Sequence, residues 1–280
     1  MSRAGTRTID QVHRWVLPAL ARYFRLELVG AVDAIPRWER EPCIFVMNHT
    51  AILGLEVYLL QAALDRLRPG APRVVTTVWP AFLTMPVSGP FYRAGGCIPM
   101  TVNGVADALR AGISVLVLPE GPDATDVRDT VGPFHAGFLR IVRALQPDRD
   151  VPVVPLGWAG VDEAMPWWLT TNPLLVRLLM KRFMPRFDFA LIPRPPLLRP
   201  SKVVFVAGEP LRFRHEDLAD ETELQKQLVR VRDIVVRLVE QAATLRSRRI
   251  DESTVERVIH RVTHTRDVAW QRRDARPNHS

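Results

Sequence analysis

Cys43-Ile44-Phe45-Val46-Met47-Asn48-His49 is the stretch of sequence that decides the fold. An unbroken apolar run of this length is typical of a strand that is buried on both faces, as in a parallel sheet. The polar Asn-His pair follows directly, so we expect the histidine at the carboxyl end of the sheet, where open α/β folds bind ligands. A second run of this kind, residues 115–118, leads into Pro119-Glu120-Gly121.

Outward from this stretch, short apolar segments alternate with helical patterns along the chain. This alternation predicts an α/β protein with a largely parallel central sheet flanked by helices, including an N-terminal amphipathic helix and a C-terminal helix. The predicted strands are residues 26–29, 44–47, 74–78, 97–100, 115–118, 153–156 and 203–207. The predicted helices are residues 9–24, 53–67, 104–111, 136–145 and 222–245.

The composition indicates the kind of partner that the chain prefers. Its formal net charge is +8, which favours anionic partners such as lipid headgroups or coenzyme phosphates. Nucleic acid is not an expected partner, since the sequence has no zinc-ligand spacing, RNA-binding aromatic signature or helix-turn-helix pattern. The sequence gives no indication of oligomeric state.

The hydropathy pattern bears on the cellular location. No apolar run is long enough for a transmembrane helix, and Arg7 is followed by no sustained apolar region of a signal peptide. Cys43 and Cys97 both lie in apolar runs, so we expect buried free thiols in a reducing cytoplasm. These features predict a protein without a membrane span.

Two segments combine tryptophan and apolar residues with basic ones. Residues 9–24 include Trp15 and several arginines, and residues 165–200 include Trp167 and Trp168. Helices of this composition lie in the membrane interface, although a helix that packs on the protein core has a similar pattern. Both interpretations stay open for the first segment, membrane contact is favoured for the second, and Pro18 predicts a break in the first helix.

His49 is the first candidate for catalysis. An imidazole can act as a general base near neutral pH, and a position after a buried strand brings it to the ligand-binding edge. A single histidine is more often structural than catalytic, so the other motifs of the chain decide the matter. The sequence has no Gly-x-Ser-x-Gly elbow, which would indicate an acyl-enzyme intermediate.

Four segments in the same order resemble the motifs of the glycerolipid (lysophospholipid, 1-acylglycerol-3-phosphate) acyltransferase superfamily. The resemblance covers about residues 20–215 and ends with Gly208-Glu209-Pro210-Leu211, which is similar to the family's closing strand and turn. The motif-like segments are Asn48-His49, residues 91–100, Leu118-Pro119-Glu120-Gly121 and residues 151–155.

The resemblance implies transfer of a fatty acyl group from acyl-CoA or acyl-carrier protein to the hydroxyl of a lipid acceptor. The acceptor would be a lysophospholipid, diacylglycerol or another lipid alcohol. His49 would take the proton of that hydroxyl, a carboxylate would hold the imidazole, and backbone N–H groups after His49 would stabilise the oxyanion. The acyl donor is a substrate, so no cofactor and no metal ion are expected.

The first departure from the family pattern concerns the acid of the catalytic pair. The family has an acid five residues after the histidine, but position 54 is Gly54 and the first downstream carboxylate is Glu56. Glu56 follows His49 by seven residues, and on a helix an offset of seven returns within roughly 20° of the same face. Glu56 is therefore the predicted partner of His49, as in the diacylglycerol acyltransferase or phytyl ester synthase-like branch, where the acid is displaced. The alternative is a catalytically degenerate, acyltransferase-like lipid-binding protein.

The other departures concern arginines that the family associates with the acceptor's phosphate. Gly121 is followed by Pro122-Asp123 in place of Thr-Arg, and Met100 is followed by Thr101 in place of Arg. Their absence makes a neutral lipid alcohol a stronger candidate, unless Arg93 or Arg128 substitutes for them. The predicted catalytic residues are His49 and Glu56, and the predicted substrate-binding residues are Asn48, Glu120, Gly121, Arg93 and Arg128.

These inferences together predict the organisation and location of the protein. We expect a membrane-contacting helix at 1–25, an acyltransferase domain at 26–215, a helical extension at 216–270 and a disordered tail at 271–280. The expected location is the cytoplasmic face of the cell membrane, with membrane lipids and the acyl donor as partners.

Overall fold

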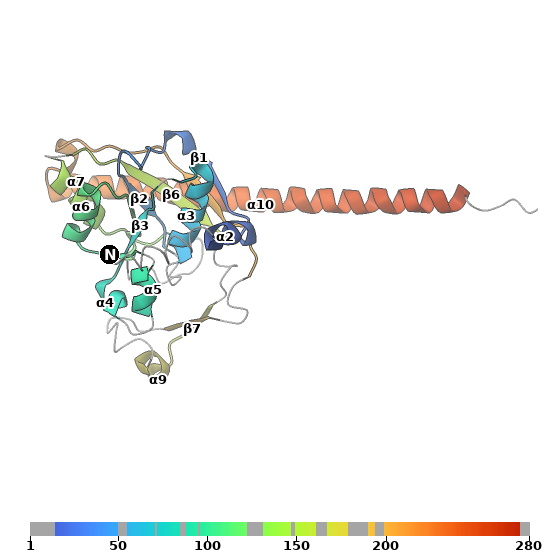
Figure 1. The fold of residues 1–280 in the computed structure, drawn as a ribbon, viewed down its shortest axis with the longest axis horizontal. Helices are drawn as coiled ribbons and strands as arrows, with labels where there is room; N and C mark the ends of the chain where they lie inside the picture. The colour runs from blue at the N-terminus through green and yellow to red at the C-terminus, as the bar shows by residue number, and fades with distance from the viewer. Residues whose placement is uncertain are drawn as a thin grey trace, which may run out of the picture.

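The central sheet carries the functional residues of the chain. The computed structural model describes residues 15–49, 55–70, 72–84, 88–94, 96–121, 131–146, 149–160, 167–178, 190–193 and 199–274. Seven strands of this part form one sheet in the order β1-β9-β6-β2-β5-β3-β4 (Figure 1). The pairing of β6 with β9 is antiparallel and the other pairings are parallel. The strands are β1 Glu27–Gly30, β2 Ile44–Met47, β3 Val75–Val78, β4 Ile98–Pro99, β5 Val115–Val117, β6 Val153–Ala159 and β9 Val204–Ala207.

The α/β class, the largely parallel sheet and all seven predicted strands are confirmed. The largest difference in length is in β6, which continues to Ala159 beyond the predicted end at residue 156. Every residue of β6 is buried, including Gly157 and Trp158, so the strand continues as long as its neighbours cover both faces. The glycine obscures this continuation in the sequence, because glycine is uncommon in strand interiors.

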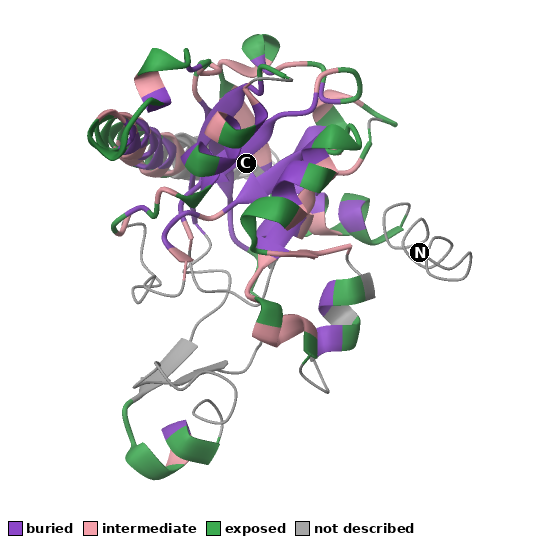
Figure 2. Cartoon of the chain, turned by 90° about the vertical axis from the view of Figure 1, so that its left-hand side faces the viewer, coloured by how far each residue is buried: buried purple, intermediate pink, exposed green. Residues whose placement is uncertain are grey.

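Helices cover both faces of the sheet and create two large apolar cores, and a third, smaller cluster joins β6 and β9 to α10. One core joins the sheet to α2 and α3, and the other joins it to α6, α7 and the first part of α10. Figure 2 shows the buried residues in the middle layer and the exposed ones on the outer faces of the helices. The helices are α2 Leu17–Tyr23, α3 Leu55–Leu67, α4 Pro80–Thr84, α5 Ser88–Ala94, α6 Val102–Arg110, α7 Gly137–Leu145, α9 Pro173–Val176 and α10 Glu221–Asp274, with short 3-10 helices at Val32–Ala34 and Glu216–Leu218.

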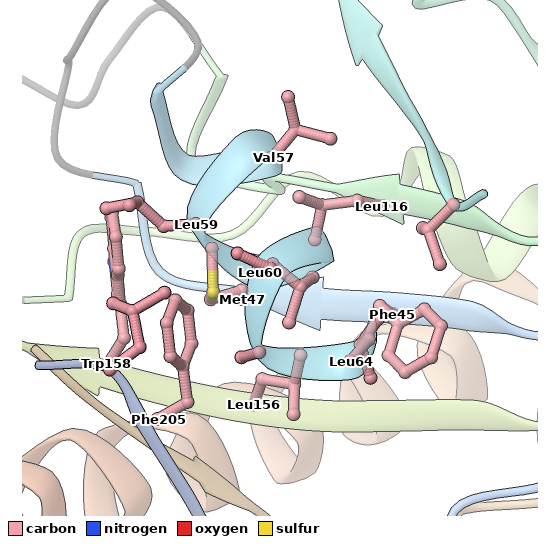
Figure 3. Packing of buried hydrophobic residues seen from close by; sticks show 14 of the residues in the cluster. Phe45, Met47, Val57, Leu59, Leu60, Leu64, Leu116, Leu156, Trp158 and Phe205 are labelled. Carbon is pink, nitrogen blue, oxygen red and sulfur yellow. The ribbon is translucent and has the colours of Figure 1, made fainter. Parts of the chain in front are cut away.

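Helix α3 is fixed to the sheet by a dense apolar contact. Figure 3 shows Leu59, Leu60 and Leu64 of α3 in one cluster with Met47 of β2 and Leu156 of β6, all of them fully buried. Complete burial of one such side chain stabilises the fold by about 1.5–3 kcal/mol. The core therefore holds the end of β2 and the start of α3 in one rigid arrangement.

Helix α10 approaches the opposite face of the sheet at a glycine. A Cβ atom on Gly157 would lie 2.4 Å from the carbonyl carbon of Leu238 and from the amide nitrogen of Val239, which only a glycine avoids. Farther along, α10 runs past the edge of the sheet and away from the body (Figure 1). The helix continues to Asp274, beyond the predicted end at residue 245 and into the stretch predicted as a tail.

The N-terminal helix combines the two interpretations that its sequence allows. Within α2, Leu17 and Ala21 are buried against the core, and Phe24 follows them there. Trp15 and Val16, which precede α2, are 71% and 42% exposed. Trp15 and Val16 are π-helical and α2 begins at Leu17, so the predicted break is a change of helix type, and Pro18 in the first turn of α2 leaves no helical hydrogen bond unmade. Residues 1–14 of this predicted helix lie outside the described part.

The second segment with tryptophans differs from its prediction. Trp167 and Trp168 begin a strand, β7 Trp167–Thr170, which pairs antiparallel with β8 Ala190–Pro193. The helix expected here is wrong for these residues, because aromatic and β-branched side chains favour strands and the tertiary structure supplies a partner strand. We call residues 167–178 and 190–193, which include β7, α9 and β8, the arm. Figure 1 shows β7 and α9 apart from the main sheet.

Two predictions from the apolar runs concern the cysteines and membrane-spanning helices. Cys43 and Cys97 are free thiols, as predicted, but only Cys43 is fully buried and Cys97 is partly exposed. Burial raises the pKa of each to about 12. Neither thiol is ionised at neutral pH, so neither is suited to act as a nucleophile. Within the described residues, no helix combines the length and the apolar character that a bilayer crossing requires.

Candidate active site

The site lies where the neighbouring parallel strands β2 and β5 end. Val46 of β2 is the register partner of Val117 of β5, so His49 and Glu120 meet at the same distance beyond the two strands. The backbone N–H of His49 donates a hydrogen bond of 2.7 Å to Oε1 of Glu120. The two motifs of the sequence are therefore one site in the structure.

His49 and Glu56 form a hydrogen-bonded pair. The distance from Nδ1 of His49 to Oε1 of Glu56 is 3.0 Å, as the displaced-acid hypothesis requires. A carboxylate accepts, so Nδ1 carries the proton and the lone pair of the histidine lies on Nε2. The Glu56 side chain is only 1% exposed, whereas that of His49 is 24% exposed. The imidazole can therefore meet a substrate while its partner stays in the protein.

The surroundings of His49 favour its protonated form. Burial acts to lower the pKa of His49, but the hydrogen bond and charge of Glu56 and the charge of Glu120 outweigh it. The pKa is therefore raised above its ordinary value of 6.5. A raised pKa strengthens the imidazole as a base and stabilises the imidazolium that forms when it takes a proton.

Glu120 binds two backbone groups of the site. Its Oε1 accepts from His49, its Oε2 accepts from the N–H of Gly132 at 2.8 Å, and the residue is 2% exposed. Burial raises the pKa of Glu120, against the opposing effect of both hydrogen bonds and of the charges on His49 and Arg232. Each oxygen of Glu120 thus binds a backbone N–H, which positions His49, and substrate binding by Glu120 stays a prediction.

Asn48 also bonds to the backbone of a neighbouring segment. It is completely buried, its Oδ1 accepts from the N–H of Trp158 at 3.1 Å, and its Nδ2 donates to the carbonyl of Trp158 at 3.4 Å. An asparagine in this setting bridges β2 to β6 across the end of the strands. In this structure Asn48 therefore has a structural role, and substrate binding by it stays a prediction.

Gly121 forms the turn that follows Glu120. Its φ is +58°, a left-handed conformation that favours glycine, and its N–H donates to the carbonyl of Leu118 at 3.1 Å. A Cβ atom there would lie 3.4 Å from the imidazole Cδ2 of His135. The turn thus brings His135 beside the third motif. Substrate binding at Gly121 stays a prediction.

Of the two arginines predicted to bind the acceptor's phosphate, the structure describes only Arg93. Arg93 is exposed and donates through Nη1 to the carbonyl of Leu83, which joins α5 to α4. Arg128 lies outside the described residues, as do Gly54 and the expected oxyanion site at 50–54. Thr101, which stands where the family has arginine, is the N-cap of α6 and accepts from the N–H of Gly104 at 3.1 Å. Its hydroxyl therefore serves the helix.

An unusual oxygen lies behind the His49–Glu56 pair. Oε2 of Glu56 is buried without a hydrogen-bond partner among the described residues. Such an atom costs about 1–3 kcal/mol, and costs of this kind concentrate at functional sites. Burial of the Tyr92 side chain raises its pKa, and the negative charge of Glu56 raises it further. The Glu56 carboxylate is thus withdrawn from water into the protein, where its attraction to an imidazolium is stronger than on the surface.

Residues that the sequence analysis missed complete the site. Gly132 provides the second N–H for Glu120, and Arg232 of α10 donates through Nε to the carbonyl of Gly132 at 2.9 Å. The available signal is that Arg232 adjoins Leu228 and Val231 on the buried stripe of a helix that is otherwise apolar on this side. Within the described part of the chain, no group of three or more His, Cys, Asp or Glu side chains could hold a metal ion.

Comparison with known proteins agrees with the motifs. Among solved structures, the 1-acyl-sn-glycerophosphate (LPA) acyltransferase PlsC from Thermotoga maritima is similar with a TM-score of 0.49. It is 18% identical, over 83% of this chain and 82% of that chain. None of the curated proteins matches the chain. The acyltransferase family model matches residues 28–159, from β1 to the end of β6, and includes His49, Glu56 and Glu120. By this match residues 28–159 of the chain are similar to an acyltransferase domain.

Proposed function

We propose that the protein is a peripheral membrane O-acyltransferase that moves a fatty acyl group from a thioester to a lipid hydroxyl. The observation that carries the proposal is the 3.0 Å contact between Nδ1 of His49 and Oε1 of Glu56. This contact supplies the imidazole–carboxylate pair at the strand end where the family has its catalytic pair. It also gives the displaced acid a function that a solvated carboxylate would not have.

The reaction needs one general base, and it replaces the C–S bond of the thioester with a C–O bond. The acceptor hydroxyl attacks the thioester carbonyl carbon while Nε2 of His49 takes its proton, so a C–O bond forms and the carbonyl oxygen becomes negative. Collapse of this intermediate breaks the C–S bond, and the imidazolium returns the proton to the leaving thiolate. The products are an ester and a free thiol. Glu56 stabilises the imidazolium throughout and fixes the tautomer that leaves Nε2 unprotonated.

The acceptor that fits best is a lipid alcohol with little negative charge. Thr101 caps α6 at the position where the family has an arginine, and the described residues place no arginine in contact with His49 or Glu56. Without a bidentate cation a phosphate monoester has less to recognise it. Diacylglycerol or another lipid alcohol is therefore our first choice, with lysophospholipid as the second, and acyl-CoA or acyl-carrier protein as the donor.

Exposed apolar residues support attachment to a membrane at its cytoplasmic face. Trp15 is 71% exposed before α2, and Leu174 and Leu178 are 68% and 67% exposed on the arm. Such side chains gain free energy in the headgroup and acyl boundary, and Arg177 between the leucines can bind an anionic lipid. The location brings the site to its water-insoluble acceptor.

An acceptor panel tests the proposed function. Wild type, His49→Ala and Glu56→Gln are incubated with labelled acyl-CoA or acyl-carrier protein and with diacylglycerol, a long-chain alcohol or a lysophospholipid. We expect ester formation by wild type and its loss, by at least about a hundredfold, in both variants. His215→Ala is the matched control, because His215 is exposed on another part of the surface and should leave the rate unchanged.

Each other outcome selects a different function. Free fatty acid without ester would indicate a hydrolase that uses water as the acceptor. Lipid binding without turnover in all proteins would indicate the catalytically degenerate alternative. Full ester formation by His49→Ala would overturn the mechanism, and full ester formation by Glu56→Gln would overturn the role of the displaced acid.

A further inference from the structure

The starting observation is an arginine that reaches from the C-terminal helix to the active-site edge. Arg232 of α10 donates through Nε to the carbonyl of Gly132 at 2.9 Å and through Nη2 to the carbonyl of Val131 at 3.0 Å. Its guanidinium thus holds two consecutive carbonyl groups with one planar fork. A lysine would not reproduce this geometry, because its ammonium is a single point charge.

The segment that Arg232 holds is the one that binds Glu120. The N–H of Gly132 donates to Oε2 of Glu120 at 2.8 Å, and Oε1 of the same carboxylate accepts from the N–H of His49 at 2.7 Å. A Cβ atom on Gly132 would lie 2.9 Å from Oε2, so a glycine permits this close approach. A continuous path of hydrogen bonds therefore joins Arg232 to the backbone of His49.

Helix α10, which carries Arg232, is packed firmly against the sheet. Leu228, Val231 and Val235 of α10 are buried in the core beneath the sheet, on either side of Arg232 in the sequence. Gly157 lets α10 lie directly against β6. Arg232 also lies outside residues 28–159, the segment that matches the acyltransferase family model.

We propose that Arg232 is a positioning residue for the acyl transfer, acting through Gly132 and Glu120 on the backbone of His49. The inference rests on the proposed function, since it assigns the residue to that reaction. Two consequences follow from the two properties of the guanidinium. Its fork fixes the 131–132 segment, and its charge helps to keep the Glu120 carboxyl ionised and thus able to accept from both N–H groups.

The pH dependence of the reaction rate distinguishes a positioning role of Arg232 from a role in folding alone. The charged groups around Glu120 are His49 with its partner Glu56, and Arg232 with Asp233, whose carboxylate lies 3.8 Å from Nη1 of Arg232. Without the arginine the pKa of Glu120 rises further, because one of the charges that oppose its burial is gone. Glu120 then takes a proton at a higher pH, so its protonation adds to that of His49 and the acid limb, which His49 sets in wild type, moves to higher pH.

The experiment is a double-mutant cycle on the full chain, with Arg232→Met, Arg232→Lys, Glu120→Gln and Arg232→Met/Glu120→Gln. We expect Arg232→Met to lower kcat at least about tenfold with a much smaller change in KM, and to raise the pH of the acid limb. Arg232→Lys should keep the limb and recover part of kcat. In the Glu120→Gln background the loss from Arg232→Met should shrink to about twofold or less, since the path is already broken.

Arg230→Met is the matched control on the same helix. Arg230 is exposed and donates to Gln227 at 3.2 Å, so its removal should leave kcat and the acid limb unchanged. Multiplicative losses in the cycle, an equal loss for Lys and Met, or a kcat of Arg232→Met within twofold of wild type would each overturn the proposal.

A second readout does not depend on turnover. Hydrogen exchange of the His49 and Gly132 amides, both donors to Glu120, should accelerate in Arg232→Met and stay unchanged in Arg230→Met. An inactive wild type with this pattern would contradict the proposed function and leave the positioning path intact. Unchanged exchange at both amides in Arg232→Met would overturn the path itself.

Discussion

The strand-end site and the arm have opposite structural designs within one chain. At the site, Glu120 is 2% exposed and ties His49 to Gly132, while Glu56 is 1% exposed. On the arm, Leu174 and Leu178 are about two-thirds exposed, and β7 with α9 lies apart from the sheet (Figure 1). The difference separates precise placement of a base, which needs a packed core, from surface attachment, which needs exposed apolar side chains.

The largest effect should come from loosening the site without removing its base. In Glu120→Gln one oxygen becomes an NH2 group, so either His49 or Gly132 loses its acceptor. A hydrogen bond to a charged group contributes about 1.5–3 kcal/mol, so kcat should fall by about ten- to a hundredfold. Steady-state kinetics measures the loss, and Glu216→Gln, at an exposed position, is the control. A kcat like that of wild type would show that the site does not need this constraint.

The second-largest effect should be a loss of stability when the close contact between Gly157 of β6 and α10 is disturbed. Gly157→Ala places a Cβ atom 2.4 Å from the backbone of α10, and the overpacking should lower the free energy of unfolding by about 1–3 kcal/mol. Thermal unfolding should then show a Tm lower by about 2–4 °C for each kcal/mol.

The control for this clash is another glycine in a regular element. Gly137→Ala in α7 meets nothing within 4 Å and should leave Tm unchanged or slightly higher. Equal behaviour of the two alanine variants would mean that the core beneath the site is not closely packed.

The smallest effect on the folded protein should come from the arm. The double variant Leu174→Ser/Leu178→Ser removes two exposed apolar side chains, so binding to anionic vesicles should fall at least about tenfold while Tm stays constant. Turnover of a short-chain acceptor dispersed in water should not change. Val229→Ser removes an apolar side chain that is 49% exposed on α10 and serves as the control in vesicle sedimentation. Undiminished binding by the double variant would assign membrane contact to another surface.

The sequence predicts the site and the arm unequally. The strands of the sheet follow from apolar runs, which act within a few residues. Glu56 was expected near His49 because one helix would carry both, but α3 spans Leu55–Leu67 and His49 is not helical, so the contact is found for a different reason than the one that predicted it. The pairing of Trp167–Thr170 with Ala190–Pro193 was missed because a strand pair depends on a partner that local pattern does not identify.

The roles of individual polar residues were harder to predict than their positions. Asn48 and Glu120 were expected to bind substrate, yet both bond to the backbone of neighbouring segments. Arg232 was missed because its target lies a hundred residues away along the chain. Hydrogen bonds between distant segments have no periodic signature in a sequence, so only the folded structure reveals them.

The pH dependence of kcat/KM in wild type and Glu56→Gln tests the His49–Glu56 pair most directly. His49 must be neutral to take a proton, and its raised pKa means that wild-type activity should rise with pH through a value above 6.5. Glu56→Gln removes the hydrogen-bonded charge that raises this pKa, so the acid limb should move to lower pH while the plateau falls at least about a hundredfold. An acid limb and a plateau that are both unchanged in Glu56→Gln would contradict the assignment of Glu56 as the partner of the catalytic histidine.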